Sequence, residues 1–156
     1  MAYGSMIIVS SEPRGRFTEG IISGTPKPGT CMEIVPATEP VGGRFTYRVF
    51  SGASGAAQPV IVLLPDLLQG KLATDAYVTG TRGFLYAPAN GEELNMLVAD
   101  IAGTADNHAI GDVLMIQTAT GKLIIDSSGA RKPFICLETA TAPTADALLL
   151  CQYTGD

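Results

Sequence analysis

Charged residues are scarce in this sequence. Asp, Glu, Lys and Arg make up 16% of the 156 residues, against about 25% in an average soluble domain. So few charges cover a surface thinly, and part of the apolar surface is therefore expected to lie against other chains. The longest clean apolar runs, 60–64 and 147–151, fall far short of the roughly 20 residues of a membrane-spanning helix. A membrane is not expected as a partner.

Clustered positive charge is also missing. Ten Lys and Arg residues oppose fifteen Asp and Glu residues, and the net charge is −5. Proteins that bind nucleic acids gather Lys and Arg on one surface, so no nucleic acid is expected as a partner. The first seventeen residues have neither the basic start nor the apolar stretch of roughly 7 to 15 residues that marks a signal peptide. This predicts synthesis in the cytoplasm without secretion.

The spacings typical of metal and cofactor sites are absent. Cys31, Cys136 and Cys151 are far apart and include no CxxC pair, so structural zinc and a redox motif are not expected. We interpret the three cysteines as reduced thiols buried in a core. The glycines of 52–55 and 80–83 lack the offsets of a phosphate-binding loop. No cofactor and no metal are therefore expected.

The sequence offers one weak candidate for catalysis. Its single histidine, His108, follows Asp106 and precedes Asp112, and such a group can hold a metal or orient a base. Turns favour Asp for backbone reasons alone, and no GxSxG motif is present. We expect no enzyme and keep a ligand-binding or enzymatic barrel with its site near His108 as the alternative. Glu92 and Glu93 follow a turn and are interpreted as a solvated strand entrance.

Long amphipathic helices are excluded, because 18 glycines and 10 prolines interrupt every candidate. Residues 45–50 alternate as a half-exposed strand does, and 60–64 are apolar throughout, which predicts a strand buried on both faces. Residues 112–125 predict a hairpin that turns at 119–122. Asp66 is expected to cap a single helical turn that ends at Gly70. Further strands are predicted at 6–9, 31–36, 84–88, 94–101, 134–138 and 147–153.

Short strands separated by turn residues predict an all-β fold, a single compact β-barrel or β-sandwich. No internal repeat and no linker is evident in the sequence. Residues 21–156 are therefore expected to form one β-barrel or β-sandwich domain. Residues 1–20 contain little that can be buried, and they are interpreted as an extended N-terminal arm, with a simple edge strand as the alternative.

Degenerate strand and turn motifs are found at 58–66, 69–71, 75–77, 91–94, 111–114 and 120–123. In these motifs the chain resembles the head decoration, or cement, proteins of tailed bacteriophages. The resemblance covers roughly residues 20–153 and brings no catalytic motif with it.

This resemblance implies a structural virion protein, made in the host cytoplasm, that sits as a homotrimer on the outer surface of the capsid. There it would stabilise contacts between subunits of the major capsid protein. Another virion part, such as a fibre or head-tail domain, is a second alternative. The arm would contribute capsid-binding residues, namely Ile7, Ile8, Val9, Arg14, Arg16 and Phe17.

Overall fold

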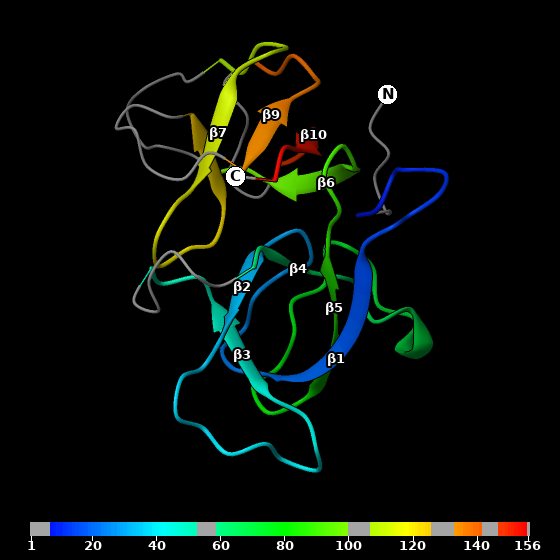
Figure 1. Ribbon diagram of the computed structural model, residues 1–156, viewed down its shortest axis with the longest axis vertical. Coiled ribbons are helices and arrows are strands. Elements are labelled where there is room, and N and C mark those ends of the chain that lie inside the picture. The colour runs from blue at the N-terminus through cyan, green and yellow to red at the C-terminus, as the bar shows by residue number, and fades with distance from the viewer. Residues whose placement is uncertain (1–6, 53–58, 100–106, 126–132, 142–146, 156) are drawn as a thin grey trace.

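The computed structural model describes residues 7–52, 59–99, 107–125, 133–141 and 147–155. Within these residues it contains ten β-strands and one 3-10 turn, and no α-helix. The prediction of an all-β fold is confirmed. The strands are short and are arranged in two groups of five that follow one another along the chain (Figure 1).

The first five strands form a closed barrel in the order β1-β3-β2-β4-β5. β1 runs antiparallel to β5 and parallel to β3, and the remaining neighbours are antiparallel. Buried side chains fill the interior of this barrel: Ile22, Met32, Tyr47, Ile61, Leu63, Tyr77 and Leu85. The strands are β1 (Arg16–Ile22), β2 (Cys31–Ile34), β3 (Thr46–Val49), β4 (Ile61–Leu63) and β5 (Arg82–Ala87).

The last five strands form a sheet in the order β6-β10-β9-β7-β8. Val98, just after β6, makes a parallel bridge with Leu123 of β8, and this bridge brings the two outer strands of the sheet together. The strands are β6 (Glu93–Leu97), β7 (Val113–Ile116), β8 (Leu123–Ile125), β9 (Phe134–Cys136) and β10 (Leu148–Tyr153).

The two groups share one topology. When β6 to β10 are matched in order to β1 to β5, every neighbouring pair in the second group corresponds to a neighbouring pair in the first. A parallel contact also falls on the same pair in both units, β1–β3 in the barrel and β6–β8 in the sheet. The chain therefore contains one five-stranded unit twice, although its sequence shows no repeat.

β4 joins the two units. Ile61 and Leu63 fill the interior of the barrel, whereas Val60, Val62 and Leu64 belong to the core of the second sheet. All three residues of the strand are buried, which confirms the predicted burial on both faces. The outer face of the barrel is thus the inner wall of the second unit, and the two units share a continuous apolar core.

Backbone hydrogen bonds also cross between the units. The N–H of Cys31 donates to the carbonyl of Gly121 (2.8 Å), and the N–H of Leu97 donates to the carbonyl of Gly29 (3.1 Å). Gly121 lies in the 119–122 turn of the β7–β8 hairpin, which pairs as predicted. A Cβ atom on Gly121 would lie 2.3 Å from the carbonyl oxygen of Cys31. The turn therefore needs glycine both for its positive φ and for this close approach.

Two further predictions concern the first half of the chain. The single helical turn is confirmed as η1 (Leu67–Gln69), with Asp66 as N-cap and Gly70 as left-handed C-cap. Residues 16–20 of the expected arm pair with β5 as part of β1, so the expected boundary at residue 20 falls inside a strand. The N-terminal residues 7–10 lie against β6, because Ile8 bridges to Leu94.

We expect Gly121→Ala to destabilise the protein by about 2 kcal/mol more than Gly70→Ala. Both glycines have similar φ angles, 64° and 69°, but among the described residues nothing lies within 4 Å of a Cβ placed on Gly70. The control therefore carries only the φ penalty of about 1–2 kcal/mol, whereas Gly121→Ala also overpacks the contact between the units. Urea unfolding of both variants measures the difference. Equal losses would show that the turn does not hold the units together.

Candidate interaction surfaces

The β4–β5 connection, residues 64–81, exposes large apolar side chains. Leu68 is 78% exposed and Leu67 is 69% exposed, and Leu72 and Val78 are exposed as well. The two leucines lie on η1, which consists of a single turn and buries none of its residues. We call residues 64–81 the apolar connection. Exposed apolar groups on one connection are typical of a surface that meets another chain.

The apolar connection is firmly attached to the barrel. The N–H of Tyr77 donates to the carbonyl of Pro26 (2.9 Å), and the N–H of Gly80 donates to the carbonyl of Ile22 (2.7 Å). The hydroxyl of Tyr77 donates to the carbonyl of Leu64 (2.8 Å). Burial is the largest influence on the pKa of Tyr77 and raises it, so this hydroxyl stays protonated and keeps donating. The exposed leucines are thus presented from a fixed support.

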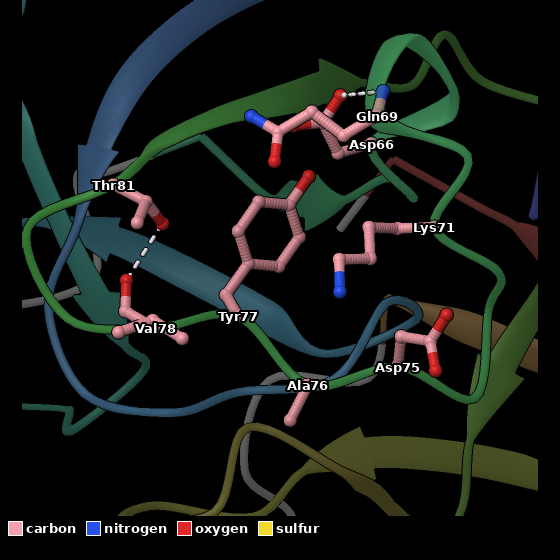
Figure 2. Close-up of a pocket in the computed structure, with 8 residues that line it drawn as sticks. All are labelled: Asp66, Gln69, Lys71, Asp75, Ala76, Tyr77, Val78 and Thr81. Atoms are coloured by element: carbon pink, nitrogen blue, oxygen red, sulfur yellow. Dashed lines mark hydrogen bonds between the residues drawn. The ribbon is translucent and has the colours of Figure 1, made fainter.

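A small cavity of about 70 Å³ lies beside η1. Figure 2 shows the residues that line this cavity. The ring of Tyr77 stands in the middle of the view, with Lys71 and Asp75 on one side of it and Val78 and Thr81 on the other. Pockets for small organic ligands usually have volumes of about 300–1,000 Å³. This cavity is too small for such a ligand and has the size of one side chain from a partner.

The predicted capsid-binding residues fall into two groups. Ile7 is buried in the core of its own chain, Ile8 and Val9 are half-buried, and the N–H of Val9 donates to the carbonyl of Glu93 (3.0 Å). These three residues therefore add a short strand-like segment to β6 within the same chain. Ile7 is buried, so a partner protein cannot reach it.

The second group lies next to and within β1. Arg14 and Arg16 are exposed. Phe17 is 58% exposed, and its ring centroid lies 4.7 Å from that of Tyr86. The backbone around Arg14 and Gly15 is fixed, because both N–H groups donate to the Glu92 carboxylate. Arg14, Arg16 and Phe17 remain available to a partner.

The structure corrects the sequence-based interpretation of Glu92. It was expected on a solvated strand entrance, but it is only 2% exposed. Its carboxylate accepts hydrogen bonds from the hydroxyl of Tyr86 (2.7 Å) and the N–H of Ala89 (2.7 Å), in addition to those from Arg14 and Gly15. Glu92 therefore ties the segment before β1 to the link between β5 and β6.

These hydrogen bonds set the ionisation of Glu92. Burial alone would raise its pKa, but the bonds from the Tyr86 hydroxyl and from three backbone N–H groups favour the carboxylate and lower the pKa below the ordinary value of 4.5. Burial and the hydrogen bond to the Glu92 carboxylate raise the pKa of Tyr86 to about 12. Near neutral pH the site is therefore a carboxylate facing a protonated phenol.

The alternative site near His108 involves a buried residue. His108 is 2% exposed, and its backbone exchanges two hydrogen bonds with Ala140. The carboxylate of Asp112 accepts from the N–H of Ala109 (2.7 Å), as expected of a turn residue. Asp106 lies outside the described residues. In the part of the chain that the structure describes, no three His, Cys, Asp or Glu residues are grouped so as to bind a metal.

The cysteines lie where they were expected. Cys31, Cys136 and Cys151 are all buried and none is in a disulfide. Among the described residues there is also no helix with the length and apolar character needed to span a membrane.

Neither the models of protein families nor the curated proteins include a match to this sequence.

The exposed leucines were missed as candidates at the sequence level. The available signal was the pair Leu67–Leu68 between a predicted cap at Asp66 and a predicted stop at Gly70, because a single turn offers no helix face for burial. Their exposure depends on the rest of the fold, which the local sequence does not reveal.

We expect Glu92→Gln to lower the free energy of unfolding by about 3 kcal/mol at pH 7, because an amide presents one acceptor oxygen and turns its NH₂ group towards backbone donors. Glu93→Gln, at the partly exposed neighbour, is the matched control and should change stability by less than about 0.5 kcal/mol. Urea unfolding of both variants is the measurement.

The pH dependence of the same variants is a second readout. The folded pKa of Glu92 lies below its unfolded value, so its contribution is complete above about pH 4.5 and disappears as the pH falls through the folded pKa. Wild-type protein should lose this part of its stability below pH 4.5, and Glu92→Gln should not. Parallel curves for the two proteins would contradict the assigned role of the carboxylate.

Proposed function

We propose that this chain is a decoration protein of a tailed-bacteriophage head. In this proposal it binds the outer surface of the capsid as a homotrimer and stabilises contacts between subunits of the major capsid protein. The observation that carries the proposal is the apolar connection, which holds four exposed apolar side chains on a firmly attached loop. A protein that joins others needs such a preformed surface.

The apolar connection supports capsid binding through its chemistry. Each leucine that becomes buried against a partner contributes about 1.5–3 kcal/mol. The small cavity beside η1 adds a place for one side chain of the partner. Since little of this surface must become ordered on binding, most of that free energy is available for affinity.

The start of β1 offers a second group of interface side chains. Arg14 just before β1 and Arg16 and Phe17 at its start are exposed, so two cations and an aromatic ring are available besides the leucines. Aromatic residues and Arg are enriched in protein interfaces. In the proposed complex the arginines face acidic groups of the capsid, and Ile7 stays within its own core.

We expect wild-type protein to sediment with undecorated capsids of the phage that encodes it, at a fixed number of copies per capsid. The double variant Leu67→Ser/Leu68→Ser should bind at least about tenfold more weakly, because losing 1.4 kcal/mol already has that effect. Both side chains are exposed and lie in neither core cluster, so the fold should be retained. Co-sedimentation over a range of protein concentrations is the measurement.

The matched control is Val41→Ser/Phe45→Ser, which removes two exposed apolar side chains from the β2–β3 connection. It should bind capsids as wild type does. Light scattering of all three proteins reports their oligomeric state, with a trimer expected for each. If wild-type protein does not sediment with capsids, the decoration role is wrong. If the leucine variant binds as tightly as wild type, the role stands but the apolar connection is not the binding surface.

A further inference from the structure

Two cysteines that are distant in sequence lie directly opposite each other in the second sheet. β9 and β10 are antiparallel neighbours, and Cys136 is the register partner of Cys151. The next pair along the ladder is hydrogen-bonded, because the N–H of Leu137 donates to the carbonyl of Leu150 (2.9 Å). The cysteines therefore occupy a non-hydrogen-bonded position, where Cα atoms are about 4.5 Å apart. That spacing lies within the range of about 4.4–6.8 Å found for disulfides.

The two thiols differ in their surroundings. The Cys136 thiol donates to the carbonyl of Glu138 (3.0 Å), and the Cys151 thiol lies 3.4 Å from the carbonyl of Leu149. A hydrogen bond between the two side chains favours the thiolate of Cys136 and lowers its pKa to about 7, and the same bond raises the pKa of Cys151. In the reaction proposed below, Cys136 therefore has the role of the nucleophile and Cys151 that of the resolving thiol. Both side chains are fully buried, so the oxidant considered is the small molecule hydrogen peroxide.

We propose that Cys136 and Cys151 form an oxidisable dithiol, which a peroxide converts into a disulfide between β9 and β10. The Cys136 thiolate attacks one oxygen of hydrogen peroxide, the O–O bond breaks, and hydroxide leaves as Cys136 becomes a sulfenic acid. The Cys151 sulfur then displaces the sulfenic oxygen, which leaves as water. Overall, two thiols lose two hydrogen atoms and one hydrogen peroxide is reduced to two molecules of water.

The third cysteine belongs to the same core cluster but to another sheet. Cys31 lies on β2 of the barrel, where its register partner is Val62. Of the three pairings that three cysteines allow, Cys136–Cys151 is the one that the sheet register places directly opposite each other, and the pairing with Cys31 is therefore an outcome that the test must distinguish.

The test uses the native full-length protein, freed of reductant and treated with hydrogen peroxide. Remaining thiols are alkylated after unfolding, and the protein is cleaved without reduction by a protease specific for glutamate. Cleavage after Glu138 separates the two cysteines, so their peptides stay joined only by a disulfide. We expect reactive thiols to fall from three to one, with Cys136 linked to Cys151. Three remaining thiols, a bond to Cys31, or oxidation of Cys136 to sulfinic acid without a bond would overturn the proposal.

Two variants test which cysteines form the bond and which thiol reacts first. Cys31→Ser should still form the bond. Cys151→Ser should stop at the sulfenic acid of Cys136. Because this side chain is fully buried, the peroxide-treated folded variant is unfolded in the presence of dimedone, which then traps the sulfenic acid. The absence of a trapped adduct would contradict the assigned nucleophile. The thermal midpoint of oxidised wild type should rise and return to its initial value with dithiothreitol. If Cys151→Ser does not fold, the peptide map of wild type decides alone.

Discussion

Both halves of the molecule depend on the double burial of β4. This strand has three residues, and its two faces serve different cores, with Ile61 and Leu63 inside the barrel and Val62 against the second sheet. A charge on either face would have to be buried without a partner, which costs several kcal/mol. Because one unit supplies the wall that closes the core of the other, the two units fold as one body, and the backbone bonds at Gly29 and Gly121 fix how they meet.

Local signals in the sequence predicted the local structure well. The alternation of 113–116 and the turn at 119–122 identified the β7–β8 hairpin, and Asp66 and Gly70 marked both ends of η1. Such features depend on neighbouring residues alone. The unbroken apolar run at 60–64 indicated two buried faces, although not that the second face meets another five-stranded unit.

Features that depend on residues distant in sequence could not be predicted from local patterns. The repeated topology is visible only through pairing, because strands with unrelated sequences fill equivalent positions in the two units. Glu92 looked solvated because it follows a turn, yet its four donors come from Tyr86, Ala89 and the segment before β1. In the same way, nothing near Cys136 indicates that Cys151 is its partner across the ladder.

Two corresponding pairs of strands are connected differently in the two units. β4 and β5 are joined by residues 64–81, whereas the corresponding strands β9 and β10 are joined by residues 137–147. β2 and β3 are joined by 35–45, against 117–122 for β7 and β8. The short turn at 117–122 lies against the barrel, while the longer connections of the barrel carry exposed apolar residues. Since the strands already complete the shared core, extra residues in a connection are free to serve a surface. The carboxylates of the core have a different task. Glu33 is fully buried against Arg48 (2.7 Å), and Glu92 holds the link between the units.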